Sequence, residues 1–504
     1  MNDFVPNWLQ QRARISPNHV ALIYERQLMS FAALAARAIR ASARLWQLGI
    51  RRGDRVALLM SNRPEFAELI HGLTRLGAVA VPLNSRLSPP ELTRQLVDCR
   101  ANLLVSDLTV RNTVAAVRSA LPLPVVSVDR HTPEDDCSLA DIEPDVQTDA
   151  AQIDLQTVHS IVYTSGSTGH PKGVLLTCGN HLWSAIGSAF NLGVHADDRW
   201  LACLPFCHVG GLAILVRGVT YGITVVMHKG FDPERVNRAI DAERVTILSV
   251  VANMLQRLLD TRGERPYPPW LRCVLLGGGP VPLALLEACA ARRIPVMQTY
   301  GLTEAASQVA TLAPRDAARK LGSAGKPLLP TEVVLSGPAG PVPAGEVGEI
   351  LIRGPTVSPG YVGEAGAANR PDGWLPTGDL GRYDEEGFLY ITGRRDDMIV
   401  SGGENIAPAE VEAALQSHPA VAEACVFGVP DQQWGATVAA SVRLRPGTTV
   451  SVVQLKEYVR RCLAGFKIPR LIQLVDEFPR TASGKIIRRQ VQANSLARGD
   501  RSGR

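Results

Sequence analysis

Runs of apolar residues alternate with amphipathic segments from the start of the chain to about residue 320. The strand-like runs include 55–60, 79–83, 223–228 and 245–251, which are almost wholly apolar. Segments between them, such as FAELIHGLTRLGA at 66–78, have the apolar spacing of a helix. This rhythm of strand and helix predicts α/β architecture, with layered parallel-type sheets covered by helices on both faces.

The pattern changes beyond residue 320. Glycine and proline become dense, and short alternating runs such as EILIRG and GFLYITG follow, which predicts a small β-rich subdomain at about 320–395. After GRRDD, the helix-like PAEVEAALQSH and the strand-like EACVFGV and TVAASVRL indicate a compact α+β unit. We therefore predict an N-terminal domain over 1–395 and a small, mobile C-terminal domain over 396–504, with a flexible tail after about 492.

Composition narrows the class of protein. The 504 residues are 46% apolar and 20% charged, which is typical of a soluble globular protein. A net charge of +5 favours a mixed solvated surface over a nucleic-acid-binding one, so no nucleic-acid partner is expected, and it also suits an anionic substrate. The nine cysteines form no CxxC pair, and neither a signal peptide nor a transmembrane segment is predicted, which favours the cytoplasm.

The stretch YTSGSTGHPKG at 163–173 has the composition of a phosphate-binding loop. It is not a Walker loop, because Gly173 follows Lys172 where that loop needs a serine or threonine for Mg²⁺. Its glycines would let backbone N–H groups approach a phosphate, and Lys172 adds a positive charge. The alternative is a flexible surface hairpin. The candidate phosphate-binding residues besides Lys172 are Thr164, Ser165, Gly166, Ser167, Thr168 and Gly169.

Four further motifs follow in order along the chain: QTYGLTE at 298–304, TGDL at 377–380, GRRDDMIVSGGENIAPAEVE at 393–412 and PRTASGK at 479–485. Together with the loop, they resemble the adenylate-forming superfamily of acyl- and aryl-CoA synthetases, adenylation domains and luciferases. The resemblance implies that a carboxylate attacks the α-phosphate of ATP and that the CoA thiol then attacks the acyl-adenylate. ATP, Mg²⁺ and CoA as co-substrate are therefore the expected ligands.

The resemblance also implies roles for particular residues. Lys485 would bridge carboxylate and phosphate, Thr303 would lie near the α-phosphate, and Glu304 would hold Mg²⁺. Asp379 and Arg394 would bind the ribose. The adenine would lie between Tyr300 with Gly301 on one side and a thin wall of glycines on the other, namely Gly277, Gly278 and Gly279.

Each of these residues has an ordinary alternative, such as a solvated charge at Lys485 or a turn aspartate at Asp379.

Asp396, within GRRDD, would be the hinge on which the C-terminal domain rotates. Such a rotation is needed because Lys485 must leave before CoA can approach the same carbonyl carbon.

The sequence segments between the motifs are more specific to one branch of the superfamily than the motifs are. LPFCHVGGLAILVRGVTYG, VTILSVVANMLQRLLD and QTYGLTEAASQVATL resemble the menaquinone-pathway members of the superfamily, the 2-succinylbenzoate–CoA ligases. Such an acid needs a slot for its ring and a donor or cation for its second carboxylate. Candidate pocket residues are His208, which is also a catalytic candidate, together with Gly278, Ser249, Asn253 and Arg217; a helix-surface position is the alternative for Arg217.

Three other functions stay open from the sequence. The chain could activate another carboxylic acid, load a carrier protein in place of CoA, or bind nucleotide without catalysis. The intact set of Lys172, Glu304, Asp379, Arg394 and Lys485 argues against the last of these. A homo-oligomer is possible, and the sequence assigns no residue to CoA.

Overall fold

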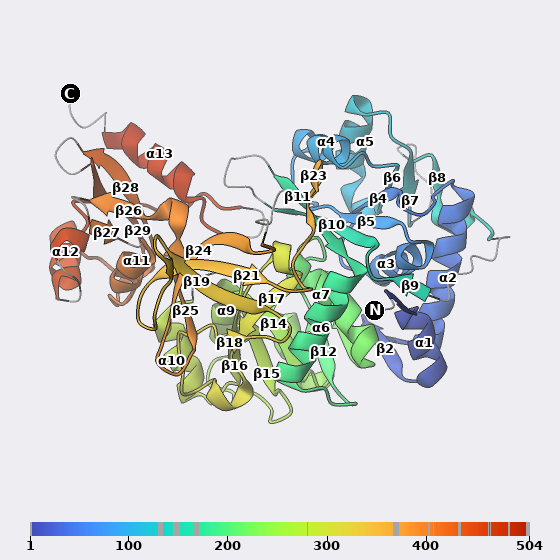
Figure 1. The fold of residues 1–504 in the computed structure, drawn as a ribbon, viewed down its shortest axis with the longest axis horizontal. Helices are drawn as coiled ribbons and strands as arrows, with labels where there is room; N and C mark the ends of the chain where they lie inside the picture. Colours follow the sequence, from blue (N-terminus) through green and yellow to red (C-terminus); the bar gives the residue numbers. More distant parts are fainter. Residues whose placement is uncertain are drawn as a thin grey trace.

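The predicted alternation of strands and helices forms two nine-stranded sheets in the computed structural model (Figure 1). The structure describes residues 3–129, 135–144, 152–164, 171–279, 281–365, 372–401, 404–406, 408–431, 435–461, 463, 465–481 and 484–499. Both sheets are parallel in their interiors and antiparallel at one or both ends, so the expected parallel-type sheets are mixed at their edges.

The first sheet has the strand order β23–β22–β11–β10–β5–β4–β6–β7–β8. Its strands β4 and β5 are buried on both faces, which explains why their sequences are continuous apolar runs. In chain order the strands are β4 (Arg55–Leu59), β5 (Val79–Pro82), β6 (Leu103–Ser106), β7 (Val125–Ser127), β8 (Cys137–Ser138), β10 (Val158–Thr164), β11 (Lys172–Thr177), β22 (Gly360–Tyr361) and β23 (Glu364–Ala365).

The second sheet has the order β18–β17–β16–β15–β14–β12–β13–β2–β3. Its strands are β2 (Val20–Tyr24), β3 (Gln27–Ser30), β12 (Arg199–Ala202), β13 (Thr224–Met227), β14 (Ile247–Val250), β15 (Cys273–Leu276), β16 (Val296–Leu302), β17 (Ser307–Thr311) and β18 (Lys326–Pro327). A separate pair joins β1 (Phe4–Pro6) to β9 (Gln152–Asp154).

Helices fill three layers around these two sheets. One hydrophobic core joins the facing sides of both sheets through the central helices α1 (Trp8–Ile15), α2 (Phe31–Gln47), α3 (Pro64–Leu76), α6 (Cys178–Leu192) and α7 (Val209–Tyr221). A second core lies under α8 (Pro233–Ala242), α9 (Ala252–Arg262) and α10 (Leu283–Ala291), and a third under α4 (Pro89–Asp98) and α5 (Arg111–Ala120).

Local sequence signals set the ends of the helices. Helix α3 starts with Pro64 in its first turn and ends at Gly77, whose φ of +68° is left-handed. Helix α6 starts at a capping box in which Thr177 and Asn180 exchange side-chain-to-backbone hydrogen bonds. These stops keep α6 and α7 within the central layer.

The expected β-rich subdomain is an antiparallel sheet of order β20–β19–β21–β24–β25. Its strands are β19 (Glu332–Gly337), β20 (Gly340–Pro341), β21 (Gly348–Arg353), β24 (Leu375–Tyr383) and β25 (Leu389–Arg394). The sheet lies between the two large sheets and the C-terminal domain (Figure 1).

The C-terminal domain has its own sheet and its own hydrophobic core. It contains β26 (Ile399–Ser401), β27 (Glu404–Ile406), β28 (Val421–Asp431), β29 (Gly435–Leu444) and β30 (Leu471–Leu474), with α11 (Pro408–Gln416), α12 (Val452–Arg460) and α13 (Arg488–Gly499). Helix α13 extends to Gly499, past the start of the tail predicted after about 492. Helix α13 continues because Val491 and Ser495 are buried on its inner side, with Val491 packed against Cys425 and Phe427.

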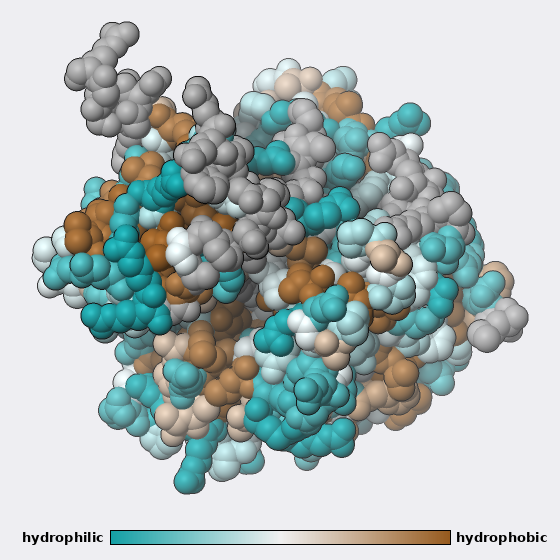
Figure 2. All heavy atoms as spheres, turned by 60° about the vertical axis from the view of Figure 1, so that its left-hand side comes forward, coloured by the Kyte–Doolittle hydropathy of each residue, from teal (hydrophilic) through white to brown (hydrophobic). Residues whose placement is uncertain are grey.

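No helix among the described residues combines the length and apolar character that a bilayer crossing needs. Hydrophilic and hydrophobic residues are interspersed over the face shown in Figure 2.

Three histidines are buried together where the first sheet meets the central helices. His71, His159 and His181 are 6%, 3% and 2% exposed, and the rings of His159 and His181 lie 4.6 Å apart between centroids. Burial lowers the pKa of His71 to about 3 and that of His159 to about 4, and it lowers the pKa of His181 well below its usual value.

We therefore expect the free energy of unfolding to fall as pH drops below about 6.5. The unfolded chain binds protons there, whereas the buried histidines of the folded chain stay neutral until about pH 4. Each histidine contributes a slope of about 1.4 kcal/mol per pH unit. Urea unfolding between pH 7.5 and 5 measures this slope of the free energy of unfolding against pH. His71→Leu should lower the slope by the contribution of one histidine, about 1.4 kcal/mol per pH unit; an unchanged slope in His71→Leu would contradict this account.

Candidate active site

The candidate site lies at one edge of the second sheet. Because β12, β14, β15 and β16 run parallel, their carboxyl ends meet at this edge. Ser249 is near the end of β14, the three glycines follow β15, and Tyr300 and Gly301 end β16. His208 follows β12 and immediately precedes α7. The fold therefore gathers segments that are far apart in the sequence.

Asp379 is the centre of a buried polar cluster. Its Oδ2 accepts a hydrogen bond from the Tyr300 hydroxyl at 2.8 Å, and its Oδ1 accepts one from Arg394 Nε at 2.8 Å. Burial acts to lower the pKa of Arg394, but the Asp379 carboxylate outweighs it and raises that pKa. Burial and the same carboxylate raise the pKa of Tyr300. These two hydrogen bonds tie Asp379 to Tyr300 and Arg394, which is more than a turn aspartate needs.

Glu304 and Lys172 are joined through a tyrosine that the sequence did not single out. The Tyr361 hydroxyl donates to Glu304 Oε1 at 3.0 Å, and Lys172 Nζ lies 5.0 Å from the centre of the Tyr361 ring. Thr303 and Glu304 lie in a single 3-10 turn, η3 (Thr303–Ala305). In the sequence, Tyr361 is only a tyrosine within a Gly/Pro-rich stretch. Its position beside Lys172 follows from the pairing of β11 with β22 in the structure.

Glu304 is the carboxylate that the sequence assigns to Mg²⁺. Among the described residues, no group of three histidine, cysteine or carboxylate side chains could hold a metal ion. A site with one carboxylate fits Mg²⁺, which is usually held by one or two carboxylates together with phosphate oxygens.

The ends of the phosphate-type loop are fixed by strand pairing. Thr164 and Lys172 face each other as an antiparallel pair at the ends of β10 and β11. Five predicted loop residues lie outside the described part of the chain: Ser165, Gly166, Ser167, Thr168 and Gly169. Their role stays a prediction.

The glycines next to the site let the backbone approach closely. A Cβ on Gly301 would lie 1.7 Å from the carbonyl oxygen of Ser307, so no side chain fits there. Gly278 has a φ of +85°, which favours glycine, and a Cβ there would lie only 3.2 Å from Val251 Cγ1.

Lys485 reaches this site from the C-terminal domain. It is accessible to solvent but lies among enough protein that desolvation, followed by the charge of Arg394, lowers its pKa, whereas Asp379 opposes the shift. Its loop is held by hydrogen bonds between Thr481 and the backbone of Lys485, at 3.1 and 2.8 Å. Residues from two domains therefore meet at the Asp379 cluster.

His208 faces the same space. Burial and the nearby charges of Lys485 and Arg86 lower its pKa. Its Nε2 atom is buried and has no hydrogen-bond partner in the described part of the chain. His208 therefore presents a neutral imidazole with a nitrogen unpaired in that part of the chain, as a histidine that lines a ligand pocket would. A core histidine with all its hydrogen bonds made, the alternative, would not leave Nε2 unpaired.

The other predicted pocket residues are not all brought together. Ser249 is buried, and its hydroxyl accepts a hydrogen bond from Trp200 Nε1 at 3.0 Å, whereas Asn253 is exposed in the first turn of α9. Arg217 is only 2% exposed, so the helix-surface alternative is wrong. It lies nine residues beyond His208 along α7, or about 13 Å, which separates it from the rest of the set.

The predicted hinge lies in the 3-10 turn η5 (Arg395–Asp397), between β25 and β26. The residues on either side of Asp396 are held by different domains. Arg395 pairs with Glu349 of β21 at 3.1 Å, and Asp397 pairs with Arg488 of α13.

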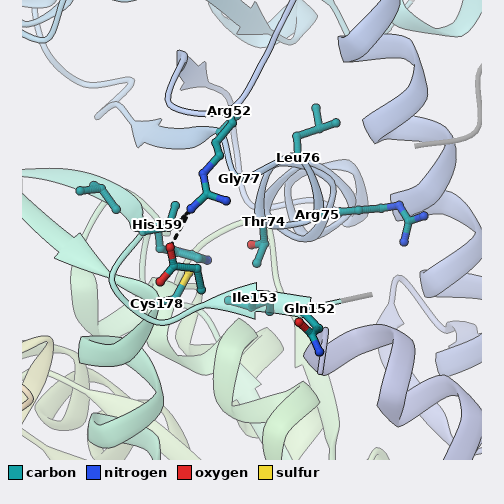
Figure 3. Close-up of a pocket in the computed structure, with 13 residues that line it drawn as sticks. Arg52, Thr74, Arg75, Leu76, Gly77, Gln152, Ile153, His159 and Cys178 are labelled. Carbon is teal, nitrogen blue, oxygen red and sulfur yellow. Dashed lines mark hydrogen bonds and ion pairs between the residues drawn. The ribbon is translucent and has the colours of Figure 1, made fainter. Parts of the chain in front are cut away.

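A cavity of about 420 Å³ lies elsewhere, between the end of α3 and β9 (Figure 3). Arg52 crosses it to pair with Asp154 at 2.7 Å. None of the predicted site residues lines this cavity.

Comparison with known proteins places these features in a family. The AMP-binding enzyme profile matches residues 9–362, and the profile of the AMP-binding enzyme C-terminal domain matches residues 410–485. The 2-succinylbenzoate–CoA ligase of Geobacillus kaustophilus is 47% identical over 490 residues, which cover 97% of each chain.

Two solved structures are similar over nearly the whole chain. The o-succinylbenzoate CoA synthetase of Bacillus subtilis in complex with its acyl-adenylate intermediate has a TM-score of 0.90 at 41% identity, over 97% of this chain and 98% of that one. A double mutant of the same enzyme bound to a CoA product analogue has a TM-score of 0.73 at 42% identity, over 97% and 99%.

The hydrogen bond from Tyr300 to Asp379 generates a first prediction for this site. Tyr300→Phe leaves Asp379 Oδ2 without its buried donor, which should raise the KM for ATP by about tenfold in pyrophosphate exchange. The KM for the acid should stay unchanged. The partly exposed Tyr390→Phe in β25 is the matched control, and an unchanged KM for ATP in Tyr300→Phe would refute the assignment.

Proposed function

We propose, from the premise that the chain belongs to the AMP-binding enzymes, that it is a 2-succinylbenzoate–CoA ligase. A carboxylate oxygen of the acid attacks the α-phosphorus of ATP, and the bond to pyrophosphate breaks. The sulfur of CoA then attacks the carbonyl carbon of the acyl-adenylate, the thiol proton is lost, and AMP leaves. The product is a thioester in menaquinone biosynthesis, formed in the cytoplasm.

The observation that carries the proposal is the 47% identity over 97% of both chains. That match spans β12, α7, β14, β15 and β16, whose ends form the candidate site, as well as the ATP motifs. A relative that shared only the nucleotide-binding residues would not support the choice of acid.

The geometry of the site supports the roles assigned to the nucleotide-binding residues. Asp379 is buried, and its oxygens can accept ribose hydroxyls when Tyr300 and Arg394 share them. Lys172 and Glu304, joined through Tyr361, would face the phosphates and their Mg²⁺ from opposite sides. The Mg²⁺ ion would neutralise the negative charge that develops when the carboxylate attacks the phosphate.

The position of Lys485 fits the first half-reaction. It lies near Arg394 and Asp379 on one side and near His208 on the other, between the nucleotide residues and the acid pocket. The higher TM-score with the acyl-adenylate complex than with the CoA-analogue complex, at nearly equal identity and coverage, supports the same assignment. Rotation at Asp396 would remove Lys485 for the second half-reaction.

Lys485→Ala should separate the two half-reactions. Loss of one charged donor to the transition state should slow adenylate formation by about 10²-fold or more. Thioester formation from preformed acyl-adenylate and CoA should stay near the wild-type rate. Pyrophosphate exchange measures the first and thioester absorbance the second. Lys456→Ala, in the same domain, is the control, and an equal fall in both half-reactions would show that Lys485 has another role.

A panel of acids tests the substrate. 2-Succinylbenzoate should exceed benzoate and hexanoate in kcat/KM by at least ~10²-fold, because a site built for a second carboxylate leaves polar groups unpaired with acids that lack it. ATP–pyrophosphate exchange followed by detection of the thioester gives the ranking. A monocarboxylic acid at the top of the ranking would overturn the substrate but not the enzyme class.

A further inference from the structure

Arg217 is a buried cation in the middle of the central helical layer. Its side chain is among the largest that are fully buried, and no carboxylate of the described residues forms an ion pair with it. Its Nε atom has no hydrogen-bond partner among those residues. A buried guanidinium without a carboxylate is costly, so the groups that do hold it are significant.

In the described part of the chain, the Arg217 guanidinium contacts side chains on two other elements, α6 and β12. Its Nη2 donates to the hydroxyl of Ser184 on α6 at 3.3 Å. Its Cζ lies 5.5 Å from the centre of the Trp200 ring on β12. The guanidinium is therefore the point where two chains of contacts meet.

The first chain of contacts leads to the turn that carries Glu304. The Ser184 hydroxyl donates to the carbonyl oxygen of Ala306 at 2.7 Å. Ala306 and Ser307 have φ angles of +51° and +110°, which residues other than glycine rarely adopt. Such a backbone conformation persists only where neighbouring groups hold it. Here the Ser184 hydroxyl holds the backbone at Ala306, two residues after Glu304.

The second chain of contacts leads to the candidate acid pocket. The indole Nε1 of Trp200 donates to the hydroxyl of Ser249 on β14 at 3.0 Å. Strand β14 ends at Val250, and the next residue, Val251, faces Gly278. The Trp200 ring therefore fixes the strand that leads into the pocket.

We propose that Arg217 is a positioning residue that sets the Glu304 turn through Ser184 and the β14 end of the acid pocket through Trp200. It contacts neither substrate. The inference rests on the proposed function, because that function assigns Mg²⁺ to Glu304 and the acid to the pocket. One buried cation would thus align the Mg²⁺ site and the acid site with each other.

Single substitutions separate the two chains of contacts. Ser184→Ala should raise the Mg²⁺ concentration for half-maximal pyrophosphate exchange by about tenfold and leave the KM for the acid unchanged. Trp200→Phe keeps the ring but removes the indole donor, and it should raise the KM for the acid by a similar factor without changing the Mg²⁺ requirement. Arg217→Met should do both.

Folding controls make these effects specific. Replacing a buried charge by an apolar side chain of similar length is often neutral for stability, so Arg217→Met should fold with a Tm near that of the wild type. Arg217→Lys, which keeps a donor for Ser184, should restore part of the Mg²⁺ response. Arg262→Met is the matched control: Arg262 on α9 is also buried and pairs with Asp241 on α8 at 2.8 Å, and its replacement should leave the Mg²⁺ requirement and the KM for the acid unchanged.

The outcomes distinguish this inference from the proposed function. Binding of Mg²⁺–ATP by calorimetry needs no acid, so weaker binding in Ser184→Ala supports the first chain of contacts even if the acid panel fails. Unchanged Mg²⁺ responses in Ser184→Ala and Arg217→Met would overturn the inference. It would also be overturned if Arg217→Met lost activity only with acids that have a second carboxylate, because Arg217 would then bind that carboxylate directly.

Discussion

The parallel pairing of β12, β14, β15 and β16 is the constraint on which the rest of the site depends. Parallel strands put their carboxyl ends at the same edge, and each connection must return through a helix to start the next strand. The glycines after β15 and the tyrosine of β16 are neighbours for this reason alone. The antiparallel subdomain then adds Asp379 and Arg394 above that edge, where β24 and β25 place them opposite each other.

The site is completed by a domain that has a hydrophobic core of its own. Lys485 comes from a loop that the C-terminal domain holds through its own hydrogen bonds, and helix α13 packs on that domain alone. The lysine can therefore leave without unfolding any part of the nucleotide-binding residues. Two independent cores are what allow one set of residues to serve two successive reactions.

The sequence predicted the elements and the motif residues because both are local signals. Periodicity located the strands and helices, and the five motifs singled out Asp379, Arg394 and Glu304, whose roles stay predictions. Sequence alone could not locate Tyr361 or Arg217, because their contacts are set by how distant elements pack. Helix α13 was equally hard to foresee: its sequence is polar, and Val491 is buried only by packing against residues of other elements, among them Cys425 and Phe427 of β28.

The two ion pairs around Asp396 have a consequence for how often Lys485 meets its target. Arg395 pairs within the N-terminal domain and Asp397 pairs within the C-terminal domain, so Asp396 is the single residue that links the two. A separate molecule would find the site only at its bulk concentration, whereas a short tether maintains an effective concentration of about a millimolar or more. Under the proposed rotation at Asp396, the lysine would return by an intramolecular step, so its return would not depend on how much of the enzyme is present.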